Sequence, residues 1–149
     1  MNTTAGLKTR KVLLAVEDNA GDARLIKECL KGAKEAVEFS VVENGLDAMA
    51  FLRQQGNYEN APRPDIVLLD LRLPIKNGRA VLAEIKQDPR LRRIPVVILT
   101  SSEADDDIAE CYELGANGYV TKPMDLDSFA RVVQSLADFW LGVAQLPRG

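Results

Sequence analysis

The sequence contains no histidine and only two cysteines, and each shortage excludes a class of site. Without histidine, the chain lacks the commonest general base of enzymes and the commonest ligand of zinc and haem. Cys29 and Cys111 fall in two separate helical patterns and form no CxxC pair, so we interpret them as free thiols. The metal chemistry that remains is that of hard cations bound by oxygen ligands.

Long apolar runs and clusters of like charge are also missing. No stretch approaches the roughly 18 apolar residues of a membrane span, and residues 1–11 contain no apolar signal-peptide core. We therefore expect a cytoplasmic protein with no membrane contact. The 19 Lys and Arg residues are scattered among 22 acids, giving a net charge of −3, so we expect no direct nucleic-acid partner.

The sequence does contain an alternating series of strand and helix patterns. Its 149 residues are 46% hydrophobic and 28% charged, a composition typical of one globular domain. Short, almost continuously apolar segments predict strands, and apolar residues spaced three or four apart predict helices. The predicted strands are 11–17, 37–42, 65–71, 95–100 and 118–121; the predicted helices are 21–34, 45–55, 78–87, 102–114 with Ser102 as N-cap, and 125–141.

This alternation predicts an α/β fold in which helices cover both faces of a doubly wound, five-stranded parallel sheet. We divide the chain into an N-terminal extension (1–10), one domain (11–141) and a C-terminal tail (142–149). Because the sequence ends soon after the fifth predicted helix, we expect no DNA-binding or catalytic output domain.

Charged side chains close three of the apolar runs in the predicted strands. Glu17 and Asp18 follow the run 12–16, Asp70 follows 66–69, and Lys122 follows 118–121. The carboxyl ends of parallel strands share one edge of the sheet, where ligands bind. We therefore expect these four side chains to form one cluster.

A cluster of three carboxylates suggests a bound cation. Neighbouring carboxylates raise each other's pKa unless a cation joins them, and with oxygen ligands alone that cation is most simply Mg²⁺. A carboxylate beside Mg²⁺ can attack a phosphorus atom to form an aspartyl phosphate, while a lysine and a hydroxyl spread the charge on the phosphoryl oxygens. Asp70, Lys122 and Thr100 would take these three roles.

These motifs together resemble the receiver domain of two-component response regulators, the chemotaxis-regulator fold. The resemblance implies a flavodoxin-like (βα)5 fold with strand order 2-1-3-4-5. A finer similarity, to the phytochrome-associated single-domain response regulators of cyanobacteria, rests on segments 55–64, 81–86 and 138–147. The receiver motifs themselves are Glu17-Asp18, the strand 66–71 followed by Leu73-Pro74 and Gly78, the strand end 99–101, and Lys122-Pro123.

The resemblance implies a specific metal site. Asp18 and Asp70 would ligate Mg²⁺ directly, and Glu17 would act mainly through metal-bound water. The backbone carbonyl of Arg72 would complete the protein ligands.

It also implies a phosphorylation site and a switch. Asp70 would accept the phosphoryl group, Thr100 would hydrogen-bond a phosphoryl oxygen, and Lys122 would pair with it. The Lys122-Pro123 peptide bond would be cis, as is usual in the family. Tyr119 would be the switch aromatic, which swings inward when Thr100 moves.

The implied protein is a phosphoacceptor in signalling, not an enzyme, although it assists its own phosphotransfer and dephosphorylation. Without histidine it cannot be the phosphodonor, so a separate sensor histidine kinase must supply the group. The finer similarity implies that this kinase is a bacterial phytochrome.

Other interpretations compete with this one. Glu17 or Asp18 alone could cap a helix, Lys122 could be a surface amine, and Tyr119 could be a packing aromatic. A haloacid-dehalogenase-type phosphatase would need an Asp where the chain has Arg72. A dinucleotide-binding protein would need a glycine loop after the first strand, where residues 17–20 are partly acidic. A receiver-like binding or scaffold module that acts without phosphorylation remains the alternative function.

The last predicted helix carries more apolar residues than one packed face requires. We predict that Leu126, Phe129, Val133, Leu136 and Trp140 pack on the sheet, and that Val132, Phe139 and Val143 form a second flank. From that flank we predict a homodimer through the face of the fourth helix, fifth strand and fifth helix. Alternatively, Phe139 and Val143 pack under the domain's own N-terminal segment or first helix.

Overall fold

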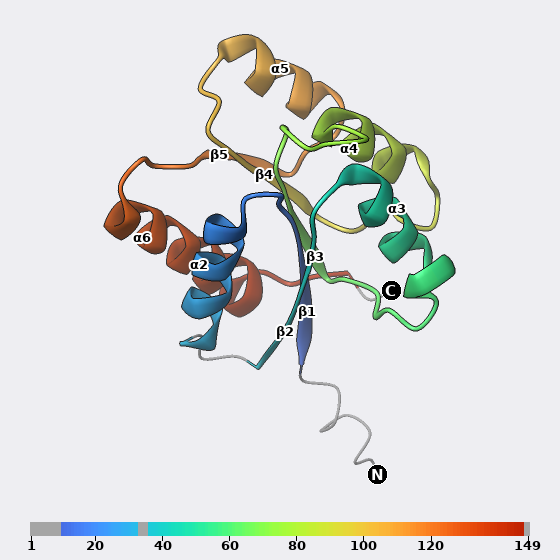
Figure 1. Cartoon of the computed structure of the whole chain (residues 1–149), viewed down its shortest axis with the longest axis horizontal. Helices are drawn as coiled ribbons and strands as arrows, with labels where there is room; N and C mark the ends of the chain where they lie inside the picture. Colours follow the sequence, from blue (N-terminus) through green and yellow to red (C-terminus); the bar gives the residue numbers. More distant parts are fainter. Residues whose placement is uncertain (1–9, 33–35, 148–149) are drawn as a thin grey trace.

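A five-stranded parallel sheet forms the centre of the computed structural model, which describes residues 10–32 and 36–147. The strand order is β2-β1-β3-β4-β5 and every neighbouring pair is parallel, which confirms the predicted topology (Figure 1). Residues 1–9 of the predicted extension and residues 148–149 of the tail lie outside the described part. The elements are β1 (Lys11–Val16), α2 (Ala20–Lys31), β2 (Val37–Val42), α3 (Gly45–Arg53), η1 (Gly56–Tyr58), β3 (Ile66–Leu69), α4 (Gly78–Gln87), β4 (Val96–Thr100), α5 (Asp105–Glu113), β5 (Gly118–Thr121), α6 (Leu126–Ala137) and η2 (Asp138–Val143).

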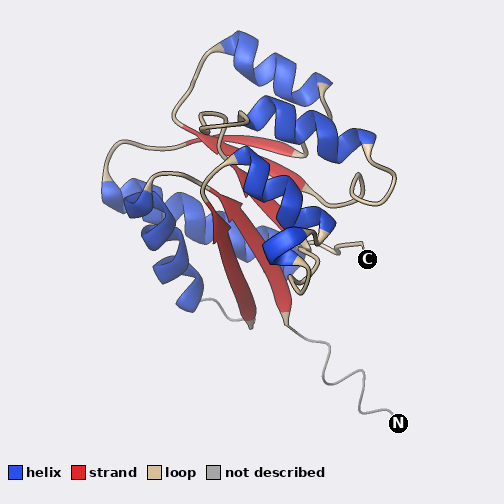
Figure 2. Cartoon of the chain, turned by 45° about the vertical axis from the view of Figure 1, so that its right-hand side comes forward, coloured by secondary structure: helices blue, strands red, loops and turns tan. Residues whose placement is uncertain are grey.

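The sheet separates two apolar layers. Alternate side chains of each central strand point to opposite faces, so Leu13 packs with one buried cluster and Leu14 with the other. One layer contains α3, α4 and α5, and the other contains α2, α6 and η2 (Figures 1 and 2). Burying a large aliphatic side chain stabilises the folded state by about 1.5–3 kcal/mol. Because the central strands are buried on both faces, every side chain along them can be apolar, which explains the apolar runs in the sequence.

The fourth predicted helix begins later than expected. Ser102 is not its N-cap; α5 starts at Asp105 after Ala104, and no side chain caps it. The Ser102 hydroxyl instead accepts a hydrogen bond from the Ala104 amide and donates one to Asp107. Three consecutive acids from Asp105 to Asp107 lie in the first turn, where carboxylates interact favourably with the helix dipole. Their charge stabilises this end without a serine cap.

The fifth predicted helix packs on the sheet with most of the expected residues. Phe129 and Val133 are buried, and Leu136 and Trp140 are partly buried against the same apolar cluster. The expectation for Leu126 is wrong: it is the first residue of α6 and is 72% exposed. α6 continues into a π-helical segment, η2, in which Leu141 is also buried.

Membrane-spanning segments are not found in the described part of the chain. None of the helices there combines the length and apolar character that a bilayer span requires.

Gly78 lets α4 begin directly against the strand that leads to the site. Its amide donates to the Leu71 carbonyl oxygen at 3.0 Å, and a Cβ atom placed on it would overlap the backbone of Asp70 and Leu71. Backbone atoms cannot move aside as the end of a flexible side chain can. Only glycine at position 78 therefore allows α4 to lie this close to the end of β3.

We predict that Gly78→Ala lowers the free energy of unfolding by about 1–3 kcal/mol, the usual cost of overpacking. Urea denaturation of both proteins measures the change. Gly142→Ala is the matched control, because a Cβ there meets no atom within 4 Å, and it should not lower the midpoint. Equal stability of Gly78→Ala and the wild type would show that α4 can shift without cost.

Candidate functional site

The carboxyl edge of the sheet brings together the four charged residues expected there. Glu17 and Asp18 directly follow β1, Asp70 follows β3, and Lys122 follows β5. Backbone hydrogen bonds continue the sheet into these positions: the Asp70 amide donates to Val16 at 3.1 Å, and the Lys122 amide donates to Thr100 at 2.7 Å. The parallel strand pairing therefore sets the backbone positions of Asp70 and Lys122, from which their side chains extend into the site.

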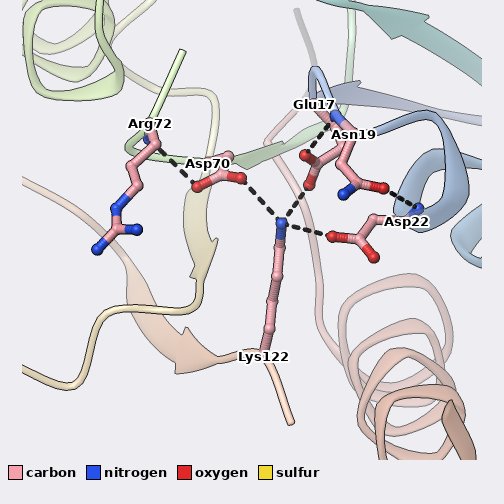
Figure 3. Close-up of polar contacts among 6 residues, drawn as sticks. All are labelled: Glu17, Asn19, Asp22, Asp70, Arg72 and Lys122. Carbon is pink, nitrogen blue, oxygen red and sulfur yellow. Dashed lines mark hydrogen bonds and ion pairs between the residues drawn. The ribbon is translucent and has the colours of Figure 1, made fainter. Parts of the chain in front are cut away.

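The Lys122 ammonium lies at the centre of the site and contacts three carboxylates. Its Nζ donates to Glu17 Oε1 at 2.6 Å, to Asp70 Oδ2 at 2.8 Å and to Asp22 Oδ2 at 2.9 Å (Figure 3). An ammonium has three N–H donors, so these contacts use all of them. The interpretation of Lys122 as a free surface amine is therefore wrong.

Burial and charge shift the pKa values of this cluster. Burial lowers the pKa of Lys122, but its hydrogen bonds to Asp70, Glu17 and Asp22 outweigh that effect and hold the pKa above its ordinary value. Burial raises the pKa of Glu17 to about 7, and repulsion from Asp70 adds to the rise, despite the contact with Lys122. Burial is the largest of these effects, and the repulsion from Asp70 is the smallest.

Three of the carboxylates are arranged to hold a cation. One oxygen each from Glu17, Asp18 and Asp70 lies within 4.8 Å of the others, with Asp18 exposed to solvent and the other two buried. Hard divalent cations prefer such oxygen ligands, and their positive charge would offset the repulsion among neighbouring carboxylates. The donor set therefore fits a divalent metal, and the exposed side at Asp18 leaves room for water ligands.

Thr100 carries a buried hydroxyl group that could donate a hydrogen bond to a ligand. It ends β4, its side chain is fully buried, and its Oγ1 has no hydrogen-bond partner among the described residues. Buried hydroxyl groups are usually paired, so each exception calls for an explanation. A ligand that accepts a hydrogen bond at this sheet edge would supply the missing partner.

Tyr119 lies on β5 and is half-buried. Its hydroxyl donates to the Ser102 carbonyl oxygen at 3.0 Å, so the phenol is directed toward the loop between β4 and α5. Burial raises its pKa. This contact links Tyr119 to the residues that follow Thr100, and the movement of the two residues together remains a prediction.

Arg72 and Pro123 complete the expected set. The Arg72 amide donates to Asp70 Oδ1 at 3.3 Å, which orients the carboxylate, while its own side chain is exposed (Figure 3). Metal ligation by its carbonyl remains a prediction. The expected cis Lys122-Pro123 bond is not present, because none of the described peptide bonds is cis. The trans isomer is the intrinsically favoured one for a bond to proline.

Sequence reasoning missed Asp22 and Asn19. Asn19 is the N-cap of α2, a role suggested for Glu17 or Asp18, and its Oδ1 accepts from the Asp22 amide at 2.9 Å. Asp22 lies in the first helical turn, where an acid is normally explained by the helix dipole alone. Its partner in the site, Lys122, is 100 residues away in the sequence, so no local spacing could identify this role.

Comparison with known proteins agrees with this geometry. The family model described as the response regulator receiver domain matches residues 13–134. The chain belongs to this family.

Individual receiver proteins are similar over nearly the whole chain. Response regulator Rcp1 of Synechocystis is 53% identical over 137 residues, which cover 92% of this receiver and 93% of Rcp1. The Mn²⁺-bound crystal structure of Rcp1 has a TM-score of 0.90 and 52% identity, covering 93% of this chain and 99% of that one. The phosphorylated cyanobacterial phytochrome response regulator RcpA has a TM-score of 0.91 and 50% identity, with 93% and 99% coverage. The predicted similarity to cyanobacterial phytochrome-associated regulators is confirmed.

For the receiver site, we predict that Thr100→Val raises the free energy of unfolding by about 1 kcal/mol. The change keeps the side-chain shape and removes a buried hydroxyl without a partner, whose burial costs about 1–3 kcal/mol. Urea denaturation of the metal-free protein measures the change. The control is Val97→Thr, which adds a hydroxyl to a buried position of the same strand and should be destabilising. A less stable Thr100→Val would mean that the hydroxyl is already bonded.

Proposed function

We propose that this receiver is a single-domain response regulator that accepts a phosphoryl group on Asp70 from a sensor histidine kinase, with Mg²⁺. The observation that carries the proposal is the contact of the buried Asp70 carboxylate with the Lys122 ammonium, beside a three-carboxylate cluster and an unpartnered Thr100 hydroxyl. These groups provide a nucleophile, a cation site and two donors for phosphoryl oxygens. Each is a necessary part of metal-assisted phosphoryl transfer to a carboxylate.

Mg²⁺ would be held by Asp18, Asp70 and the Arg72 carbonyl, with Glu17 acting through water, and it would neutralise charge on the phosphoryl oxygens. The Mn²⁺-bound structure of Rcp1, a similar receiver, supports the binding of a divalent cation. Asp18, which is exposed, would be the ligand that first meets a cation from solvent.

In the proposed reaction, a carboxylate oxygen of Asp70 attacks the phosphorus atom of a phosphohistidine. The new P–O bond forms as the P–N bond to the donor breaks, and the imidazole of the donor takes up a proton. Lys122 loses its contact with the attacking carboxylate and pairs with a phosphoryl oxygen. Thr100 donates its hydroxyl to another phosphoryl oxygen. The product is an aspartyl phosphate on the receiver, so the chain is a phosphoacceptor that assists its own phosphorylation and dephosphorylation.

The signal would leave the site through Thr100 and Tyr119. If Thr100 moves toward the phosphoryl group, it vacates space in the core beside β5. Tyr119 would turn into that space and give up its hydrogen bond to the Ser102 carbonyl oxygen. Since that loop leads into α5, the surface formed by α5, β5 and α6 would change shape.

The proposed donor is a histidine kinase of the phytochrome type. This part of the proposal rests on the similarity to RcpA, which is a phytochrome response regulator. Phosphotransfer assays with candidate phytochrome kinases in red and far-red light would test it.

The alternative function is a receiver-like scaffold that acts without phosphorylation. Its expected sign is loss of the phosphoacceptor or of the acidic pair, and both are present and arranged in one cluster. A haloacid-dehalogenase-type phosphatase is disfavoured because the position of its second Asp is the exposed Arg72.

We predict that incubation with acetyl phosphate and Mg²⁺ adds one phosphoryl group to the wild type and none to Asp70→Asn. The variant keeps the shape of the side chain and loses the nucleophile, so its fold should be intact by circular dichroism. Intact mass spectrometry measures the addition, and excess chelator should abolish it. Phosphorylation of Asp70→Asn, or an unmodified wild type, would contradict the proposed function.

We also propose a homodimer through the surface of α5, β5 and α6. A groove of about 560 Å³ lies along β5 and α6, and its apolar walls include Val120, Val132, Leu136, Phe139 and Trp140. Phe139 is 50% exposed, so the alternative that it packs under its own domain is disfavoured. Each copy thus offers both an apolar groove and an exposed aromatic at its rim. That combination suits a self-complementary twofold interface with a second copy.

We predict that Phe139→Glu converts the dimer to a monomer in sedimentation experiments at micromolar concentrations, because it places a charge in the apolar contact. Leu126→Glu is the control: Leu126 is exposed on the same helix but does not line the groove, so this variant should remain dimeric. A wild type that is monomeric with and without phosphorylation would overturn the dimer proposal.

A further inference from the structure

Asp22 differs from the other carboxylates that contact Lys122. Its Oδ2 lies 2.9 Å from Lys122 Nζ, yet Asp22 is not part of the three-carboxylate cluster formed by Glu17, Asp18 and Asp70. Its side chain is 26% exposed, compared with 3% for Glu17 and 8% for Asp70. Asp22 is therefore the one partner of the ammonium that lies outside the group suited to hold the metal.

The start of α2 fixes Asp22 in this position. Asn19 caps the helix by accepting from the Asp22 amide at 2.9 Å, and the Asn19 amide donates to Glu17 Oε2 at 3.0 Å. The same short segment thus carries both Glu17 and Asp22 and holds them on one side of the lysine (Figure 3). The cap at the start of α2 therefore positions the Asp22 backbone, and with it the carboxylate, beside Lys122.

The other two partners of Lys122 change when the site is used. A metal ion would attract the charges of Glu17 and Asp70, and phosphorylation would convert the Asp70 carboxylate into an acyl phosphate. Asp22 would be neither a metal ligand nor phosphorylated, so its contact with the ammonium would remain throughout. In Figure 3, Asp70 and Asp22 approach the ammonium from different sides, so a bond to Asp22 leaves the side facing Asp70 available.

We propose that Asp22 is a positioning residue for phosphoryl transfer, which acts by holding the Lys122 ammonium beside the phosphoryl group while the other carboxylates are engaged. The inference rests on the proposed function of Asp70 as phosphoacceptor. The carboxylate of Asp22 touches the ammonium directly, and the phosphoryl group would lie beyond it, so the attraction to Lys122 exceeds the repulsion of the phosphoryl charge.

The chain offers a matched control for this role. Asp47 lies in the first turn of α3 as Asp22 does in α2, and its amide donates to the cap residue Asn44 at 2.8 Å. Its carboxylate accepts from Asn44 Nδ2 and has no lysine partner among the described residues. Asp47→Asn therefore removes the same charge from the same helical position without touching Lys122.

The test measures two affinities of each purified, full-length variant by calorimetry: that for Mg²⁺ alone, and that for beryllium fluoride, a phosphoryl mimic, with Mg²⁺ present. Asp22→Asn should bind beryllium fluoride about fivefold more weakly, the difference between a charge-assisted and a neutral hydrogen bond, and bind Mg²⁺ as the wild type does. Asp22→Glu, which restores the charge, should recover part of the loss. Asp47→Asn should match the wild type in both affinities.

A double-mutant cycle separates positioning from a merely structural role. If Asp22 acts through Lys122, then Asp22→Asn has no further effect in a Lys122→Ala background. A loss of equal size in both backgrounds, or a parallel loss of Mg²⁺ affinity, would overturn the inference. So would unchanged beryllium fluoride binding by Asp22→Asn beside a wild type that is phosphorylated normally. A wild type that binds neither beryllium fluoride nor a phosphoryl group would refute the proposed function itself.

Discussion

The packing of acidic groups around one ammonium is the interaction on which the site depends. Glu17, Asp22 and Asp70 share the three donors of Lys122, and Asp18 adds a fourth carboxylate nearby. A single ammonium faces four carboxyl groups, and burial raises the pKa of one of them, Glu17, to about 7. The protein thus maintains a place that favours additional positive charge. This arrangement favours the binding of a divalent metal. The charge of such a metal would reduce the repulsion between Asp70 and an anionic phosphoryl group.

The strand order requires a long side chain on the residue after β5. β5 is an edge strand, and β3 and β4 separate it from β1, so the Lys122 side chain extends across the carboxyl ends of these strands toward residues that follow β1. Lysine suits this task because its ammonium is compact and its four-carbon stem is flexible. Residues 105 positions apart in the sequence meet because both follow the carboxyl ends of parallel strands and the lysine side chain spans the distance between them.

Much of this could be predicted from the sequence because the signals are local and repeated. Apolar runs ending in charged residues predicted the parallel sheet, its common edge and the cluster of Glu17, Asp18, Asp70 and Lys122. The failures came where a competing local arrangement prevailed. Ser102 bonds to Asp107, where a helix cap was expected, and Leu126, which was expected to pack on the sheet, is exposed at the first position of α6. The spacing of apolar residues does not show where along a helix the contact with the sheet begins.

Asp22 shows why the full site could not be predicted from local patterns. Asn19 with Asp22 and Asn44 with Asp47 are the same capping arrangement at the starts of two helices, with similar hydrogen-bond lengths. Only the first faces a lysine, and that lysine comes from a strand 100 residues away. Local chemistry therefore accounts equally for both aspartates as helix-starting acids. Asp22 differs from Asp47 because the fold places Lys122 next to it. A residue that is fully explained as a helix-starting acid can therefore also belong to the site, through a contact with a residue that is distant in the sequence.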